Sequence, residues 1–305
     1  MKVTIFTPTF NRAYIIEQLY RSLQRQTSFE FEWLVVDDGS SDNTEQLFDI
    51  WTHEQNPFAI RYYRKENGGK HRAINYAIPL AEGELFFIVD SDDYLTDDAV
   101  ETILEQFKTL PSADSRKYAG ICNCRGYSMN QIMGTSFNGD YLDCTALERE
   151  RHGITGDKAE VVFTYVMKQY PFPDFEGENF ITEAVVWDRM AADGFCFRFY
   201  NKIVYLCDYR DDGLTKQGME LYFRNPKGWA LYLRQCREYK KLTESVQSYF
   251  EVQCCLAWIK RMRVSEISKL LGIKTSYLVY KTMRYILREN GSKLKHLLLN
   301  KGRRE

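Results

Sequence analysis

The sequence predicts an α/β fold: a doubly wound, mixed but mostly parallel β-sheet with helices on both faces, followed by a C-terminal helical appendage. Two observations predict it. The first third of the chain alternates short β-rich segments with amphipathic helical patterns, and nearly every segment after Pro226 has helical spacing of its apolar residues. With 305 residues, 44% of them hydrophobic, the chain is long enough to bury a full core.

Four strand–helix repeats are expected in the first third. Ile15, Leu19 and Leu23 recur at helical spacing in the first helix, and the run at residues 85–89 is apolar throughout, as in a strand buried on both faces. The predicted strands are residues 3–7, 31–36, 60–64 and 85–89, and the predicted helices are residues 13–25, 44–51, 71–81 and 97–109.

The remainder of the chain predicts a less regular middle and a helical end. Scattered polar residues and glycines predict loops over residues 120–157. Helices are expected at residues 158–170 and 180–192, and strands at residues 195–200 and 203–209. In the helical appendage we expect breaks at Gly228, Gly272 and Gly291.

Charge is distributed unevenly along the chain, although the net charge is only −1. Residues 1–220 carry 22 basic and 36 acidic side chains, whereas residues 221–305 carry 19 basic and 6 acidic ones. A basic segment attached to an acidic body suggests an anionic partner, such as a membrane surface or a lipid-linked phosphate. A solvated helical face is the alternative, and the sequence leaves both open.

The cysteines and the N-terminus bear on the compartment. The eight cysteines lack metal-ligand spacing, which predicts buried, reduced thiols. The N-terminus enters a strand pattern directly, without the segments of a signal peptide. The longest apolar runs are far shorter than the roughly 20 residues that span a bilayer. We therefore expect a cytoplasmic protein that is either soluble or in peripheral contact with the inner face of the membrane.

Acidic residues follow two of the predicted strands. Asp90, Asp92 and Asp93 follow the fourth strand, and Asp37 and Asp38 follow the second. Carboxylates this close repel one another unless a divalent cation or several backbone amides lie among them, and Mg²⁺ and Mn²⁺ prefer oxygen ligands. Helix capping and ordinary turn chemistry are the alternatives. Two such strand ends in one sheet favour a ligand site, because open α/β sheets bind ligands at this edge.

Three motifs, in this order and at these separations, resemble the family 2 glycosyltransferases of the GT-A fold. They are Thr7-Pro8-Thr9-Phe10-Asn11-Arg12, Val35-Val36-Asp37-Asp38-Gly39-Ser40 and Val89-Asp90-Ser91-Asp92-Asp93. Residues 66–75 are similar to the donor-side loop and helix of that family. The resemblance covers residues 1 to about 110. It implies a nucleotide-sugar (donor) half over residues 1–115 and an acceptor-side half over 116–220. The charge count and the helical pattern set apart a basic helical region over 221–305.

The resemblance implies a metal-dependent, inverting glycosyltransferase of the hexosyltransferase class. It would move a sugar from a nucleotide diphosphate donor, UDP by default, to a hydroxyl of a saccharide or lipid-linked saccharide in bacterial cell-surface polysaccharide or glycolipid assembly. Mn²⁺ or Mg²⁺ would stabilise the leaving diphosphate. Asp92 would ligate that metal, with Asp93 as its rival. The implied donor-binding residues are Pro8, Thr9, Asn11, Arg12, Asp37, Asp38, Lys70, Arg72, Asp90 and Ser91. Among them, Asp38 would contact the base, and Asp90 the ribose or the metal's water shell. Lys70 and Arg72 would reach donor phosphate or base, and solvated surface positions are the alternative for both.

The family also places a carboxylate near the start of a helix in the second half, where it acts as the general base. Glu183 is the candidate, followed by Ala184 where many relatives carry a second acid. Asp188 is the second candidate, and at five residues further on it lies on a different helix face. A purely structural ion pair is the alternative role for Glu183.

Functions of other classes remain open at this point. The pattern at residues 264–281 resembles a helix-turn-helix, which makes DNA binding one alternative function. A nucleotidyltransferase-like protein and a non-catalytic nucleotide-sugar-binding protein are two others. Residues 8–12 contain no glycine to cradle a triphosphate, which favours a diphosphate donor. Nucleic-acid binding would leave the aspartate clusters unexplained, so nucleic acid is not an expected partner.

Overall fold

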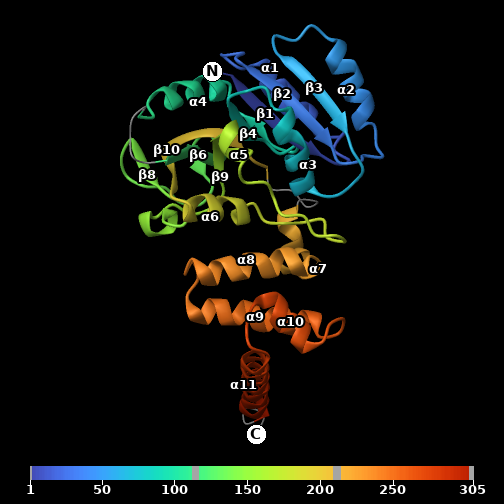
Figure 1. Cartoon of the computed structure of the whole chain (residues 1–305), viewed down its shortest axis with the longest axis vertical. Helices are drawn as coiled ribbons and strands as arrows, with labels where there is room; N and C mark the ends of the chain where they lie inside the picture. The colour runs from blue at the N-terminus through green and yellow to red at the C-terminus, as the bar shows by residue number, and fades with distance from the viewer. Residues whose placement is uncertain (1, 112–116, 209–213, 302–305) are drawn as a thin grey trace. The chain divides into compact units, whose positions relative to one another are not determined.

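The computed structural model describes residues 2–111, 117–208 and 214–301 (Figure 1). The chain forms two compact units, Met1–Gln217 and Gly218–Glu305. The predicted halves 1–115 and 116–220 both contribute strands to one sheet in the first unit. Their division into a donor side and an acceptor side stays a prediction.

The first unit is built on a ten-stranded mixed sheet. Its strands are β1 Val3–Thr9, β2 Phe31–Asp37, β3 Ala59–Arg64, β4 Leu85–Ile88, β5 Tyr94–Leu95, β6 Lys117–Ser128, β7 Gln131–Ile132, β8 Tyr141–Cys144, β9 Lys158–Phe163 and β10 Phe195–Leu206. The order is β3-β2-β1-β4-β9-β6-β10-β5, with β7 paired to β6 and β8 paired to β10. Strands β3, β2, β1 and β4 are parallel, whereas β9 runs antiparallel between β4 and β6.

Helices connect these strands. They are α1 Glu17–Gln24, α2 Thr44–His53, α3 Lys70–Ala77, α4 Ala99–Lys108, α5 Thr164–Met167 and α6 Ala184–Ala192, with short 3₁₀ turns η1 Ile78–Leu80, η2 Arg149–His152 and η3 Leu214–Gln217. The four predicted repeats are confirmed, since β1 to β4 and α1 to α4 coincide with or overlap the predicted strands and helices.

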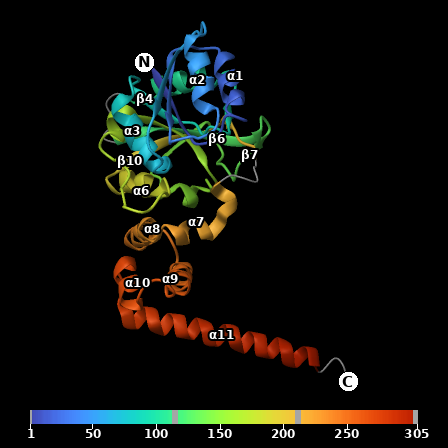
Figure 2. The same ribbon diagram turned by 90° about the vertical axis from the view of Figure 1, so that its right-hand side faces the viewer.

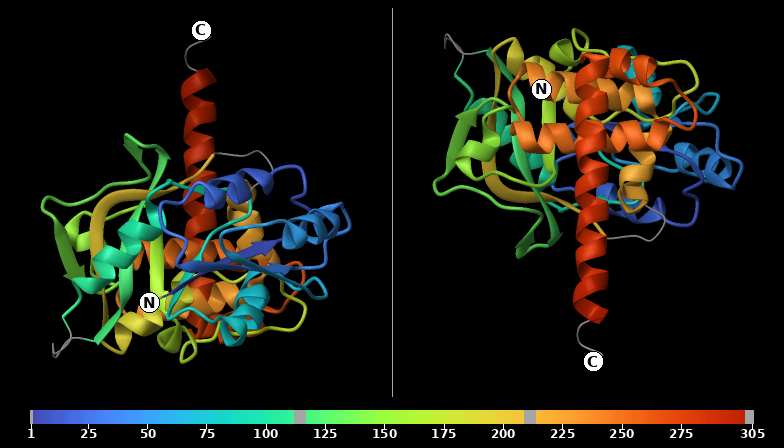
Figure 3. Two further views of the ribbon diagram at one scale, coloured as in Figure 1. Left: turned by 90° about the horizontal axis from the view of Figure 1, so that it is seen from above. Right: turned by 90° about the horizontal axis from the view of Figure 1, so that it is seen from below.

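Alternating side chains bury both faces of the parallel strands. Val3, Ile5 and Trp33 belong to a core cluster that includes residues of α1, α2 and α4. Phe6 and Phe86 stack at 5.3 Å on the other face, and α3 packs against β1 and β2. Figure 3 shows the blue helix α1 and the cyan helix α3 on opposite sides of these strands. The predicted arrangement of helices on both faces is therefore confirmed.

The expectations for the middle of the chain were partly wrong. Residues 120–157 begin in β6, a strand of 12 residues that is buried over most of its length, and residues 158–170 are mostly strand β9 followed by the one-turn helix α5. A Cβ on Gly120 would lie 2.0 Å from the Val161 carbonyl oxygen of β9. The glycine that suggested a loop is therefore required where two backbones approach closely.

Two further boundaries differ from expectation. The strands expected at 195–200 and 203–209 form the single strand β10, whose pairing with β6 shifts register between Phe199 and Ile203. Tyr209, the last residue of the second expected strand, lies outside the described residues. The helix expected from residue 180 begins only at Ala184.

The second unit is helical, as predicted. It contains α7 Gly218–Arg224, α8 Pro226–Glu238, α9 Glu244–Trp258, α10 Val264–Leu271 and α11 Thr275–Lys301. Trp229, Leu233, Trp258 and Leu278 lie in its own hydrophobic core. Gly272 separates α10 from α11, but the expected breaks at Gly228 and Gly291 were wrong, because α8 and α11 continue through them (Figure 2). A helix can absorb one glycine at a cost of about 1 kcal/mol.

The cysteines and apolar segments agree with expectation. All eight cysteines lie among the described residues and are free, and all but Cys196 are buried. No helix of the described residues is both long enough and apolar enough to cross a lipid bilayer.

Candidate active site

The loops after β1, β2 and β4 meet at one edge of the sheet, because these three strands are adjacent and parallel. The backbone N–H of Asn11 donates to Ser40 Oγ at 2.8 Å, and the Asn11 side chain accepts from the Ser41 N–H at 2.8 Å. Arg12 Nη2 lies 3.7 Å from Asp92 Oδ2. The motifs quoted from the sequence are therefore in contact with one another.

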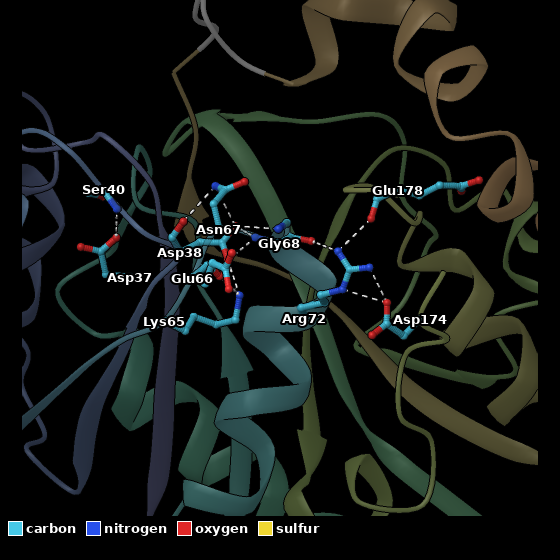
Figure 4. A network of polar contacts seen from close by, with 11 residues as sticks. Asp37, Asp38, Ser40, Lys65, Glu66, Asn67, Gly68, Arg72, Asp174 and Glu178 are labelled. Carbon is cyan, nitrogen blue, oxygen red and sulfur yellow. Dashed lines mark hydrogen bonds and ion pairs between the residues drawn. The ribbon is translucent and has the colours of Figure 1, made fainter. Parts of the chain in front are cut away.

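Asp38 is occupied by the loop that precedes α3 (Figure 4). Its carboxylate accepts from Lys65 Nζ at 2.7 Å and from the backbone N–H groups of Gly68 and Gly69, the latter at 2.6 Å. Asn67 Nδ2 adds a bond of 3.2 Å to the same carboxylate. A contact between Asp38 and a nucleotide base stays a prediction. It would require some of the hydrogen bonds between Asp38 and residues 65–69 to break.

The residues beside Asp38 are also buried. Asp37 accepts from the Ser40 N–H at 2.7 Å and from the Tyr62 hydroxyl at 2.6 Å, so its carboxylate fixes the turn after β2. Pro8 lies inside β1 opposite Val36. The buried Thr9 hydroxyl has no hydrogen-bond partner among the described residues. An unpaired buried hydroxyl is costly in a ligand-free protein, and a polar ligand group could satisfy it.

Asp90 lies between two cations. Lys70 Nζ is 2.5 Å from Asp90 Oδ1, and Arg125 Nη1 is 3.6 Å from Asp90 Oδ2. Burial alone would raise the pKa of the Asp90 carboxyl, but the charges of Lys70 and Arg125 hold it below its usual value. Lys70 and Arg125 therefore favour the ionised form of Asp90.

Asp92 and Asp93 point into different environments. The Asp93 carboxylate is buried and accepts from the Tyr205 hydroxyl at 2.7 Å, while Tyr205 in turn accepts from the Asp90 N–H at 2.9 Å. Burial, together with the charge of Asp90, raises the pKa of Asp93 to about 7. The Asp92 carboxylate is partly exposed and faces Arg12. Ser91, which lies between Asp90 and Asp92 in the sequence, is buried.

These surroundings limit how a divalent cation can be held. Among the described residues, no three His, Cys, Asp or Glu side chains converge into a cation site. Mg²⁺ and Mn²⁺ are, however, commonly held by one or two carboxylates and by substrate phosphates. The residues fit a cation held in that way, with Asp92 as the accessible carboxylate and the donor diphosphate supplying further oxygens.

Glu183 approaches Asp90 from the second half of the sheet unit. It immediately precedes α6, and its carboxylate lies 2.7 Å from the same Lys70 Nζ that binds Asp90. The Glu183 side chain is 25% exposed, whereas Asp188 is 1% exposed within α6. An acceptor hydroxyl could therefore reach Glu183 more easily than Asp188.

Arg72 does not point at the acidic cluster. Its guanidinium donates to Asp174 Oδ1 at 2.8 Å and to the carbonyl oxygens of Gly68 and Glu178, as Figure 4 shows. It also donates to the Phe175 carbonyl oxygen at 2.9 Å. It therefore joins α3 to the segment before α6. A direct role for Arg72 at the donor stays a prediction that these contacts do not support.

Three residues of this region were not identified from the sequence: Arg125 on β6, Glu160 on β9 and Tyr205 on β10. Burial raises the pKa of Glu160 to about 7, and Arg125 and Arg149 oppose that rise. The Arg125 guanidinium stacks on the Tyr205 ring at 4.2 Å. Residues 118–124 are mostly apolar, which is a pattern that indicates a buried strand. Identifying that strand would have placed Arg125 at its end, near the proposed site.

Comparison with known sequences decides the family. Residues 4–159, just over half of the chain, match the family described as glycosyl transferase family 2. The chain belongs to this family. Glu183 lies beyond the matched residues of this family 2 chain, so its role as the base stays a prediction.

Named relatives agree with this family assignment. A chondroitin synthase of Pasteurella multocida is 39% identical over 111 residues, which is 35% of this chain and 11% of that protein. Glycosyltransferase GlyG of Streptococcus pneumoniae is 32% identical over 105 residues, 34% of each protein. The matched segment thus spans about a third or less of either relative.

Solved structures support the fold of the family 2 chain. Staphylococcus aureus TarS 1–349 in complex with UDP-GlcNAc superposes with a TM-score of 0.60 at 20% identity, covering 88% of this chain and 75% of that one. The mannosyltransferase PcManGT from Pyrobaculum calidifontis, in complex with GDP-Man and Mn²⁺, gives 0.52 at 16% identity, covering 96% and 80%. The predicted GT-A fold is confirmed.

Proposed function

We propose that this chain transfers a sugar from a nucleotide diphosphate donor to an acceptor hydroxyl, with a divalent cation at Asp92 and with Glu183 as the general base. One observation carries the proposal: Asp90, in the acidic turn after β4, and Glu183, at the start of α6, lie within 2.7 Å of the same lysine nitrogen. The acidic turn and the partly exposed Glu183 carboxylate therefore lie on either side of the Lys70 ammonium.

The chemistry follows from this placement. The cation, when bound, would supply a Lewis acid for the charge that develops on the departing diphosphate. Glu183 would accept the proton of the acceptor hydroxyl as its oxygen attacks the anomeric carbon, through a state with oxocarbenium character. Direct attack by the acceptor gives inversion at that carbon. Lys70 and Arg125 keep Asp90 ionised beside the sugar nucleotide.

UDP is the proposed donor nucleotide, and a saccharide or lipid-linked saccharide is the proposed acceptor. The fold neighbour TarS 1–349 was solved in complex with UDP-GlcNAc. Relatives are named chondroitin synthase, hyaluronan synthase and poly(ribitol-phosphate) β-N-acetylglucosaminyltransferase. These names support assembly of a polysaccharide or a related polymer.

The test begins with calorimetric titration of a panel of nucleotide sugars, with and without Mn²⁺, followed by transfer assays with the donor that binds. Glu183→Gln should retain donor binding and lose transfer by about 10²- to 10⁴-fold. Asp92→Asn should lose the Mn²⁺-dependent part of donor binding. Asp97→Asn, which removes an exposed acid paired with Arg25, is the matched control. Full transfer by Glu183→Gln would refute the assignment of the base.

Helix α11 supports a second part of the proposal, contact with an anionic membrane surface. The large apolar side chains Val279, Tyr280, Met283, Ile286 and Leu287 are exposed on it, Leu287 by 70%. At 100° per residue they share one stripe, and Lys281, Arg284 and Arg288 lie along one side of that stripe. Apolar residues flanked by cations are typical of helices that lie in a lipid interface, whereas DNA binding gives no role to the apolar stripe.

Co-sedimentation with phosphatidylglycerol and phosphatidylcholine vesicles tests this part. The full chain should bind the anionic vesicles, and Leu287→Asp or Arg284→Glu should weaken that binding at least about fivefold. Lys269→Glu, the same charge reversal at an exposed position on α10, should bind like the unaltered chain. Dimerisation of the full chain that Leu287→Asp abolishes, without lipid binding, would contradict the proposal.

A further inference from the structure

Helix α3 is hydrogen bonded along its length to the segment that precedes Glu183. The Asn75 side chain donates to the Phe172 carbonyl oxygen and accepts from the Phe172 N–H, both at 2.8 Å. One turn earlier, Arg72 binds Asp174 and the Glu178 carbonyl oxygen, the latter at 2.8 Å. These contacts hold residues 172–178 against the side of α3 that carries Arg72 and Asn75.

The first turn of α3 completes this contact. Gly69 has φ of +95°, and a Cβ at this position would lie 1.9 Å from the Asn179 carbonyl oxygen, so only glycine allows the two backbones to lie this close. The next residue, Lys70, reaches Glu183 Oε1 at 2.7 Å and Asp90 Oδ1 at 2.5 Å. One helix thus fixes the spacing between the carboxylate before α6 and the acidic turn after β4.

We propose that Lys70 is a positioning residue for the general base: its ammonium ties the Glu183 carboxylate to Asp90 and so sets the distance between base and donor site. The inference rests on the proposed function, in which Glu183 takes the acceptor proton. It differs from the donor-binding role that the sequence suggested for Lys70, in which the ammonium would bind donor phosphate.

Physical chemistry favours the positioning role. An ammonium between two carboxylates at 2.5 and 2.7 Å makes charge-assisted hydrogen bonds, the strong class of hydrogen bond. The two carboxylates raise the pKa of Lys70 despite its burial, so the ammonium remains charged at any working pH. A misplacement of about 1 Å in a reacting group can cost about 10²-fold in rate, so losing this tie should act on turnover.

The experiment compares Lys70→Met with Lys70→Arg in the full-length protein. Lys70→Met should lower kcat by about 10²-fold, because the base is displaced, and should change the Kd of UDP by less than about threefold. The kcat of Lys70→Arg should be at least about tenfold higher than that of Lys70→Met. Lys202→Met, which removes a lysine from an exposed ion pair with Asp98, should leave kcat and the Kd of UDP unchanged.

A double-mutant cycle provides the second criterion. If Lys70 acts through Glu183, then Lys70→Met combined with Glu183→Gln should be no slower than Glu183→Gln alone. Multiplicative losses would overturn the inference, and so would a tenfold rise in the Kd of UDP with kcat unchanged, because that result assigns Lys70 to the donor. Failure of the unaltered chain to transfer any sugar would refute the proposed function, and this inference with it. Transfer that depends on Glu183 but not on Lys70 would overturn this inference alone.

Discussion

The acidic side chains of the proposed site lie at one edge of the sheet, but each has different hydrogen-bond or ion-pair partners. Asp37 and Asp38 use their carboxylates to hold the turn after β2 and the loop before α3. Asp90 is compensated by cations, and Asp93 is buried against Tyr205. Asp92 is therefore the carboxylate of this edge that can change partners at the lowest cost.

Replacing Asp38 with asparagine should loosen the loop before α3. The amide keeps the shape of the side chain but removes the negative charge that accepts from Lys65, Gly68 and Gly69. We expect the free energy of unfolding to fall by about 2–3 kcal/mol. Hydrogen exchange at the Gly68 and Gly69 amides should also accelerate. Asp49→Asn, at an exposed position on α2, should change neither measurement; unchanged exchange in Asp38→Asn would refute the anchoring role.

Glu160 should make stability depend on pH. Burial raises its pKa to about 7, so the folded chain holds this proton more tightly than the unfolded chain. Its stabilising contribution is complete below the ordinary carboxyl pKa and is lost as pH rises through about 7. Between pH 4.5 and pH 8 the loss should be about 3 kcal/mol. Urea unfolding at both pH values should show a smaller decrease for Glu160→Gln than for the exposed control Glu150→Gln; equal decreases would contradict this.

The positions of these residues were largely predictable, but their partners were not. The motifs at residues 7–12, 35–40 and 89–93 follow strands whose apolar patterns are strong, so their meeting at one edge follows from parallel pairing. The pairing of Lys70 with Glu183 joins residues more than 100 positions apart. No local pattern in the sequence encodes such a pairing.

Among the elements, α3 and the segment 172–183 form the connection on which the site depends, whereas β6 and β9 are the strands that sequence patterns misjudged. Helical spacing identified α3 because one of its faces packs on the sheet. Strand β9 was mistaken for a helix because it is a short apolar run that continues into α5. Its strand conformation is fixed by pairing on both sides, with β4 and β6, which are contacts from distant parts of the chain.

The fit between α3 and this segment can be tested with two glycines. Gly69→Ala places a Cβ 1.9 Å from a carbonyl oxygen, whereas Gly177→Ala, also at positive φ, has no heavy atom within 4 Å of its Cβ. Gly177→Ala should cost about 1 kcal/mol of stability from backbone strain alone. Gly69→Ala should cost at least about 3 kcal/mol and should also reduce kcat. Chemical denaturation of both variants measures the difference; equal losses would show that the close contact contributes nothing.

For the whole molecule, the two compact units each have a separate hydrophobic core. In the second, Trp258 is buried and donates its indole N–H to the Phe223 carbonyl oxygen at 2.9 Å. The nucleotide site proposed here uses residues of the first unit alone. Damage to the second core should therefore leave donor binding intact.

Trp258→Ala tests this separation. Removing a buried tryptophan should lower the stability of the second unit by about 3–5 kcal/mol, which calorimetry should record as one transition moving to lower temperature. The Kd of UDP should stay within about twofold of its original value. Ile259→Ala, at the neighbouring half-exposed position, should change neither the transition temperature nor the Kd of UDP. Loss of UDP binding in Trp258→Ala would show that the two units are energetically coupled.

The continuous sheet of the first unit has a consequence for ligand entry. Strands β4, β9, β6 and β10 are hydrogen bonded in succession, so the segments that carry Asp90, Arg125 and Tyr205 cannot swing apart as rigid lobes without breaking that ladder. Only loops and side chains are free to rearrange. Crystals grown without nucleotide should therefore survive soaking with a donor sugar, with no cracking and no change of lattice.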